Sequence, residues 1–110
     1  MNIEVYQLKA KEFIAYDETQ PFNYLLPALA EEVGELQGIY AKNFRKHGSY
    51  NLDYEQAAQV KSELGDILWN LALIARAEGF TLTSVAEGNI DKLQQRKENN
   101  EIASIQRRES

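Results

Sequence analysis

Two long segments with helical periodicity, residues 24–44 and 53–78, constrain the fold of this chain most strongly. At about 100° per residue, the apolar residues of each segment fall on one stripe of a helix. Only the short break RKHGSYNL separates the two segments. We therefore predict two amphipathic helices, which form a hairpin if they pack antiparallel. The predicted stripe over 24–44 is Leu25, Leu29, Val33, Leu36 and Tyr40. The predicted stripe over 53–78 is Val60, Leu64, Ile67, Leu71 and Ile74.

The rest of the sequence is also typical of helices. Two prolines and six glycines interrupt the 110 residues, and no stretch alternates apolar with polar residues as a strand would. We predict a first helix over 3–16 and a fourth that begins at Thr81 or Thr83 and ends near residue 97. Pro27 is tolerated if it lies in the first turn of the second helix. Asp53 and Gln56 form a capping box for the third helix, which ends at Gly79.

These elements predict an all-α fold resembling a four-helix bundle. We expect a single domain over residues 1–98, followed by a polar tail over 99–110 that is mobile or reaches a partner chain. No cysteine is present, and neither a signal-peptide core nor an apolar run long enough to span a membrane is visible. A cytoplasmic location without membrane contact is therefore expected. The net charge of −5 argues against binding to a nucleic-acid polymer.

Carboxylates border the apolar stripes of both central helices. Glu32 lies at the edge of the stripe in the second helix, with Glu35 slightly further out and Glu31 toward solvent. On the third helix Glu63 lies at the edge and Asp66 beyond it. Antiparallel packing would bring four of these carboxylates together, and such a cluster destabilises the fold unless something offsets the repulsion. Oxygen-rich clusters of this kind are typical of Mg²⁺ sites, although single E-x-x-E pairs are common on solvated helix faces.

The third helix is apolar nearly all round. Trp69, Ala72 and Leu73 project on the side opposite its main stripe, so both faces should be buried. One bundle of four helices hardly achieves this, and a second subunit is the simplest cover. Gly34 and Gly65 also lie away from the stripes, where another backbone could approach. We therefore expect a homodimer or a homotetramer.

The segments EEVGE and ELGD, with the continuation ELGDILWNLALIA and the later NIDKLQQR, together resemble the E-E-x-x-E … E-x-x-D signature of the MazG-like, all-α nucleoside triphosphate pyrophosphohydrolases. The resemblance covers most of the chain. It implies Mg²⁺ as cofactor, with Mn²⁺ as a possible substitute, and Glu32, Glu35, Glu63 and Asp66 as the metal ligands. It also implies a nucleoside triphosphate as substrate, and an oligomer with sites near the subunit boundary.

The same resemblance implies roles for other side chains. Asn89, Lys92 and Arg96 match substrate-binding positions, and their helical spacing directs donors and positive charge to one side. Lys42 is a further substrate-binding candidate because it shares a side of its helix with Glu35. The implied reaction is attack of a metal-activated water on the α-phosphorus, with Glu31 or Glu35 accepting the proton. The products would be a nucleoside monophosphate and pyrophosphate.

Two alternatives stay open at this point. A related enzyme, such as a dUTP or dCTP pyrophosphatase or a phosphoribosyl-ATP pyrophosphohydrolase, would share the metal site and differ in the pocket. A noncatalytic helical interaction module would merely keep an acidic patch.

Overall fold

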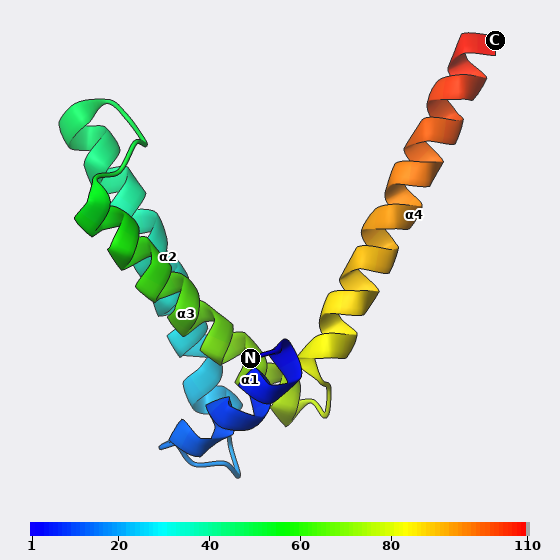
Figure 1. Ribbon diagram of the computed structural model, residues 1–110. Coiled ribbons are helices and arrows are strands. Elements are labelled where there is room, and N and C mark those ends of the chain that lie inside the picture. The colour runs from blue at the N-terminus through cyan, green and yellow to red at the C-terminus, as the bar shows by residue number, and fades with distance from the viewer. Residues whose placement is uncertain (110) are drawn as a thin grey trace.

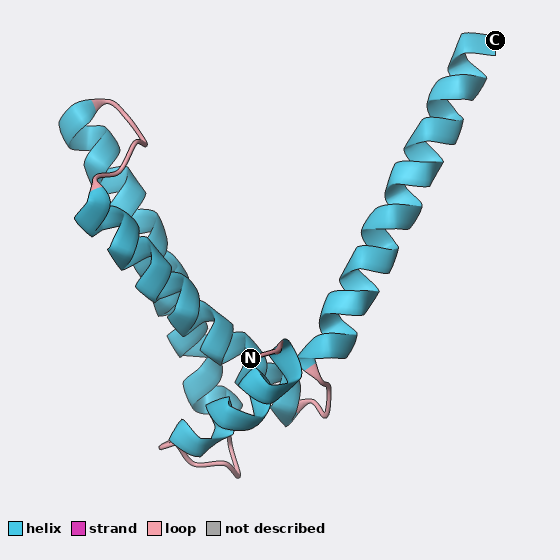
Figure 2. Cartoon of the chain, in the orientation of Figure 1, coloured by secondary structure: helices cyan, strands magenta, loops and turns pink. Residues whose placement is uncertain are grey.

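A computed structural model describes residues 1–109 of the chain, and the side chains of residues 1–100. Within this range all regular structure is helical, without a strand (Figure 2). This confirms the all-α class and the four helices. The elements are α1 (Ile3–Ala10), the 3₁₀ turn η1 (Lys11–Phe13), α2 (Phe22–His47), α3 (Tyr54–Ala77) and α4 (Leu82–Glu109).

The hairpin is present, with α2 and α3 side by side and antiparallel (Figure 1). Its connection is fixed by local polar contacts. Gly48 ends α2 in the left-handed conformation, with φ of 64°, and the Asp53–Gln56 capping box begins α3 as predicted. Asn43, which is buried, donates hydrogen bonds of 2.8 Å to the carbonyls of Ser49 and Asn51, and accepts one from Gln56. These bonds hold the end of α2 and the start of α3, on either side of the loop, at a set distance.

The apolar core lies at the other end of the hairpin, where α1 packs against α3. Leu25 and Leu73 are the largest fully buried side chains, 0% and 1% exposed. The Trp69 indole packs beside them and donates a hydrogen bond of 3.1 Å to the carbonyl of Ala10. The buried core comprises Ala10, Leu25, Ala72, Leu73, Ala75 and Leu82.

The predicted stripe of α2 is confirmed, but that of α3 is wrong in two places. All five predicted α2 residues are buried or partly buried. On α3, Leu64 and Leu71 are 51% and 43% exposed, while Ala72 and Leu73 on the other side are buried. The reason is that α1 packs against the side of α3 that carries Trp69. The residues buried on α3 are therefore partly those beside Trp69 and not those of the predicted stripe.

Helix ends differ from the predictions in three places. The first helix ends earlier, because α1 stops at Ala10 and η1 at Phe13. Helix α2 begins at Phe22, so Pro27 lies inside the helix and beyond its first turn. The fourth helix is longer than predicted, since the backbone of α4 is helical to Glu109.

Helix α4 leaves the other helices at a turn. Gly79, with φ of 83°, ends α3 as predicted. Gln7 of α1 fixes the turn, because its amide donates to the carbonyls of Ala72 and Phe80 and accepts from the amide of Leu82. Thr81 caps α4 by accepting a hydrogen bond from the amide of Ser84.

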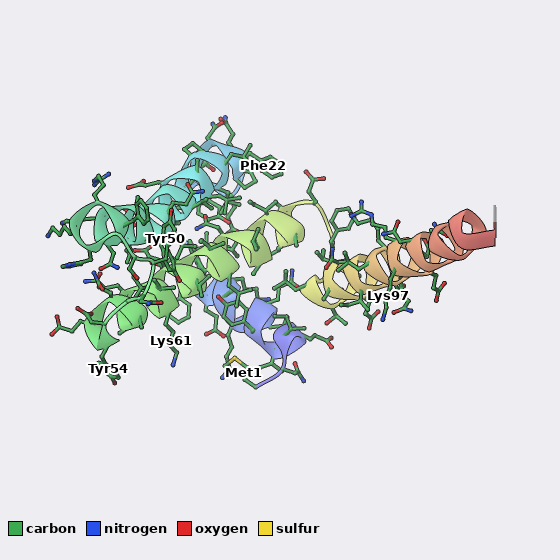
Figure 3. The ribbon with its side chains drawn as sticks, turned by 90° about the horizontal axis from the view of Figure 1, so that it is seen from above. Met1, Phe22, Tyr50, Tyr54, Lys61 and Lys97 are labelled. Carbon is green, nitrogen blue, oxygen red and sulfur yellow. The ribbon has the colours of Figure 1, made fainter. Side chains whose placement is uncertain are left out.

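Beyond this turn α4 diverges from the hairpin, and every residue from 84 to 100 is exposed (Figure 1). Seen from above, α4 runs away from the other three helices, and the part of it that carries Lys97 lies apart from them (Figure 3). One chain therefore does not close the bundle that the sequence predicted. Within residues 1–109, no helix combines the length and the apolar character needed to cross a membrane.

Candidate metal and nucleotide site

An acidic cluster lies between the two helices of the hairpin. Carboxylate oxygens of Glu32 on α2 and of Glu63 and Asp66 on α3 all lie within 4.8 Å of one another. Glu32 and Glu63 are partly buried, and Asp66 is exposed. The spacing of three residues between Glu63 and Asp66 puts both on one side of α3, facing α2. The convergence predicted from helical geometry is thus present for these three residues.

Two uncharged side chains, Asn70 of α3 and Tyr6 of α1, lie near the cluster. Asn70, 2% exposed and one turn after Asp66, donates a hydrogen bond of 2.9 Å to the Asp66 carbonyl. Tyr6 of α1 lies near enough to Asp66 to be affected by its charge. Burial first, and then that charge, raise the pKa of the Tyr6 hydroxyl. The cluster therefore has a packed wall on the α1 side, while its other end opens toward the loop of the hairpin.

Mutual repulsion changes the titration of the cluster. The pKa of Glu32 is raised to about 7, chiefly by the hydrogen bond its protonated form makes to Glu63, then by burial and by the charges of Glu63, Asp66 and Glu35. The pKa of Glu35 is also raised, chiefly by the charge of Glu63. At neutral pH Glu32 is thus only partly ionised, whereas an ordinary glutamate would be fully ionised.

With both carboxylates ionised, the Oε2 atoms of Glu32 and Glu63 are buried without a hydrogen-bond partner among the described side chains, and so is the Oδ1 atom of Asn70. Buried polar atoms normally have a partner, so the two carboxylate oxygens need an explanation. Carboxylate oxygens that converge from two helices are the ligands that hard divalent cations prefer. The donor set therefore fits Mg²⁺ or Mn²⁺, whose charge would also offset the repulsion.

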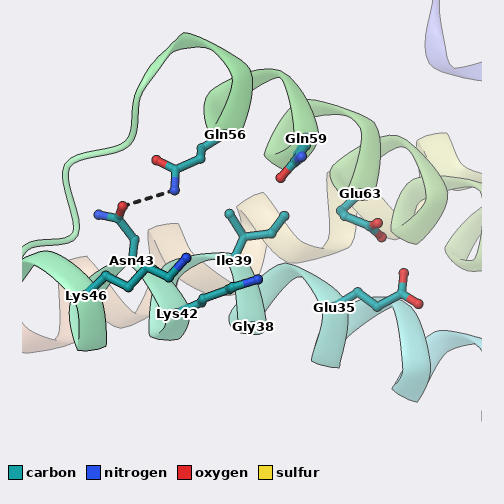
Figure 4. Close-up of a pocket in the computed structure, with 9 residues that line it drawn as sticks. All are labelled: Glu35, Gly38, Ile39, Lys42, Asn43, Lys46, Gln56, Gln59 and Glu63. Carbon is teal, nitrogen blue, oxygen red and sulfur yellow. Dashed lines mark hydrogen bonds between the residues drawn. The ribbon is translucent and has the colours of Figure 1, made fainter.

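A cavity of about 640 Å³ continues from the cluster toward the loop end of the hairpin (Figure 4). Glu35 and Glu63 line the end next to the cluster, and Lys42 and Lys46 line the other end. Gly38 and Ile39 of α2 lie between them, and Asn43, Gln56 and Gln59 complete the lining. The cavity thus joins a negative end to a positive end.

The comparisons with known proteins identify the family. Residues 20–100 match the MazG nucleotide pyrophosphohydrolase domain, which includes both central helices and most of α4. The chain belongs to the MazG family. It is also 28% identical over 104 residues to the Gene 37 protein of Mycobacterium phage L5, covering 89% of this chain and 90% of that protein. No solved structure matches. The match confirms the resemblance seen in the sequence, and it indicates a hydrolase that acts on nucleotides.

Of the remaining predicted residues, the MazG domain structure places some near the acidic cluster and others away from it. Glu35 lines the cavity and interacts with Glu63. Glu31 is exposed beside Glu35, and Lys42 reaches into the cavity. The structure does not bring Asn89, Lys92 and Arg96 to the cluster, because they lie on the exposed part of α4. The catalytic, metal-binding and substrate-binding roles of all these residues stay predictions.

Several lining residues were not predicted from the sequence. Lys46 follows Lys42 by one turn and lines the same cavity. Gln59 precedes Glu63 by one turn and points into the cavity (Figure 4). The spacing of four residues to a predicted site residue was the available signal in both cases.

Proposed function

We propose that this MazG domain is a Mg²⁺-dependent nucleoside triphosphate pyrophosphohydrolase, which converts a ribo- or deoxyribonucleoside triphosphate to the monophosphate and pyrophosphate. The observation that carries the proposal is the set of three convergent carboxylates from two helices, with two buried oxygens lacking a partner. A solvated acidic patch would not bury such atoms, because burial of an unpartnered polar oxygen destabilises a protein. We place this activity in the cytoplasm.

Glu32, Glu63 and Asp66, with Glu35 at the mouth of the cavity, are the residues that would hold the metal. Bound Mg²⁺, for which Mn²⁺ could substitute, neutralises the triphosphate and lowers the pKa of a bound water. Glu35 suits the role of general base, because it lines the cavity directly beside the cluster, within reach of a water held there. Glu31 lies beside it as the other candidate. The water bonds to the α-phosphorus, and the bond from that phosphorus to the bridging oxygen of pyrophosphate breaks.

A panel of normal and modified nucleoside triphosphates would test this function. With Mg²⁺ present, we expect at least one of them to yield equal amounts of monophosphate and pyrophosphate, both measured by anion-exchange chromatography. Chelation of the metal should stop the reaction and added Mn²⁺ should restore it. Release of orthophosphate instead would contradict the proposed site of bond cleavage. Absence of turnover across the whole panel would contradict the enzymatic activity and favour a noncatalytic module.

We also propose that the active form is a homodimer or a homotetramer, in which α4 of one chain reaches the acidic cluster of another. Within the described side chains, several large apolar residues on α3 and α4 are about half exposed, among them Leu64, Leu71, Ile90 and Leu93. A long helix exposed on all sides gains little stability by itself, so α4 needs packing from elsewhere. A Cβ atom at Gly34 or Gly65 would meet nothing within 4 Å, so a single chain gives no reason for these helix-weakening glycines. A neighbouring backbone would give one.

Complementation between two defective variants would test the shared site. Glu63→Gln removes a carboxylate from the hairpin, and Arg96→Met removes a cation from α4, so each variant alone should hydrolyse nucleotide poorly. In a mixed dimer one site has both defects and the other has none. Mixing equal amounts, with time for subunit exchange, should therefore restore about a quarter of the wild-type activity. If every site is built from one chain, mixing restores nothing.

A further inference from the structure

We propose that the cavity beyond the acidic cluster holds the pyrophosphate end of the nucleotide, bound by Lys42, Lys46 and Gln59. The inference rests on the proposed function and adds the direction in which the substrate lies. The α-phosphate would sit at the cluster, and the β- and γ-phosphates would extend from it toward the loop of the hairpin, away from the nucleoside.

The two lysines supply charge that nothing else in the described structure uses. The single ion pair among the described side chains joins Arg76 to Glu18 and involves neither lysine. Lys42 and Lys46 therefore face the cavity without a carboxylate partner within 4.0 Å. An anion bridging the two ammonium groups would form charge-assisted hydrogen bonds with both. A neutral base placed there would leave both charges uncompensated.

Of the three amide side chains in the wall, only Gln59 is available to a ligand. Asn43 and Gln56 are bonded to each other and to the loop, which leaves them a structural role. The Gln59 amide makes no hydrogen bond within the described residues, and it points from α3 into the cavity (Figure 4). Its N–H groups can donate to a phosphate oxygen across from the lysines.

The spacing along α2 suits a chain of phosphates. Glu35, Gly38, Lys42 and Lys46 follow one another in steps of three and four residues, so they share one side of the helix. Lys42 lies seven residues beyond Glu35, about 10 Å along the helix axis at 1.5 Å per residue. Figure 4 shows both lysine side chains extending back along α2 toward Glu35. They would thus approach the substrate from the end remote from the metal.

Gly38 keeps the path between the two ends open. A Cβ atom built there meets nothing within 4 Å, so the space above this residue is empty rather than filled by a neighbour. A large side chain at this position would lie between Glu35 and Lys42, where the β-phosphate would pass. Alanine would add one methyl group and leave most of the path free.

Binding of the two products separately tests the direction of the substrate. Titration calorimetry with Mg²⁺ present would measure the affinity of wild-type protein, Lys42→Met, Lys46→Met and Arg45→Met for pyrophosphate and for the monophosphate of the best substrate. Arg45→Met is the matched control, because it removes the same charge from the same helix end without lining the cavity. We expect the Kd for pyrophosphate to rise about tenfold or more in each lysine variant and to stay unchanged in the control. The Kd for the monophosphate should not move.

The other outcomes are distinguishable. Weaker binding of the monophosphate with unchanged pyrophosphate affinity would mean that the cavity holds the nucleoside, and it would overturn the inference. Unchanged affinity for both products would overturn it as well. Lysine-dependent binding of pyrophosphate by a protein that hydrolyses no triphosphate would refute the proposed function and keep the anion site. Gly38→Leu, compared with Gly38→Ala, should likewise weaken pyrophosphate binding without requiring any change of charge.

Discussion

Replacing Glu63 by glutamine is expected to lower kcat for nucleoside triphosphate hydrolysis by about 10²- to 10³-fold. Glu63 belongs to both parts of the site. Its carboxylate lies beside Glu32 and Asp66 in the cluster, and it also lines the cavity together with Glu35. Glutamine keeps the size of the side chain but removes the charge that a hard cation needs. Steady-state assays at saturating Mg²⁺ would measure the loss.

The same substitution should make the metal-free protein more stable. Removing one of several close carboxylates relieves repulsion, so the melting temperature without metal should rise while the stabilisation by Mg²⁺ disappears. Glu55→Gln is the matched control, since it removes an exposed carboxylate from the first turn of the same helix. A Glu63→Gln variant with wild-type turnover would refute the assignment of this cluster as the active site.

The sequence predicted the acidic cluster because its cause is local. Glu32, Glu63 and Asp66 lie at fixed angles from the apolar stripes of their own helices, and a short loop forces the two helices to pack antiparallel. The capping box at Asp53 and the turn at Gly79 are equally local, and both were predicted correctly. Features that depend on three or four neighbouring side chains can be read from the chain itself.

What the sequence could not fix depends on long-range contacts. The buried face of α3 is set by where α1 packs, through the Trp69 bond to Ala10, so Leu64 and Leu71 fall outside it. The direction of α4 depends on Gln7, which lies more than 70 residues before the Phe80 and Leu82 groups it binds. Nothing in the local pattern of either segment encodes such a partner.

The cavity illustrates the same limit at the level of single residues. Asn43 and Gln59 look alike in the sequence, as amides near the ends of two helices, whereas the capping box already gives Gln56 a structural role. The structure shows that Asn43 bonds to Gln56 and to the loop, whereas Gln59 remains available. Which amide serves the fold and which faces a ligand is decided by the register of α2 against α3.

Without metal, the protein is expected to lose stability as the pH rises from about 5 to above 7. The pKa of Glu32 is about 7 in the folded chain, against an ordinary value of 4.5. The folded state thus binds this proton more tightly than the unfolded chain does. The resulting contribution to stability is complete below pH 4.5 and is lost as the pH passes through about 7. Thermal melts between pH 5 and 8, in chelator, would show the trend.

Saturating Mg²⁺ should reverse this loss, and most strongly at the upper end of the range. A cation that binds the folded state at a hundred times its Kd adds about 2.7 kcal/mol to the free energy of unfolding. Binding must displace the proton held by Glu32, so the affinity for Mg²⁺ should fall as the pH drops below 7. Glu32→Gln should flatten the pH response of the metal-free protein. Equal effects of Mg²⁺ and of sodium chloride at matched ionic strength would mean that the carboxylates form a solvated patch, because screening alone would then account for the change.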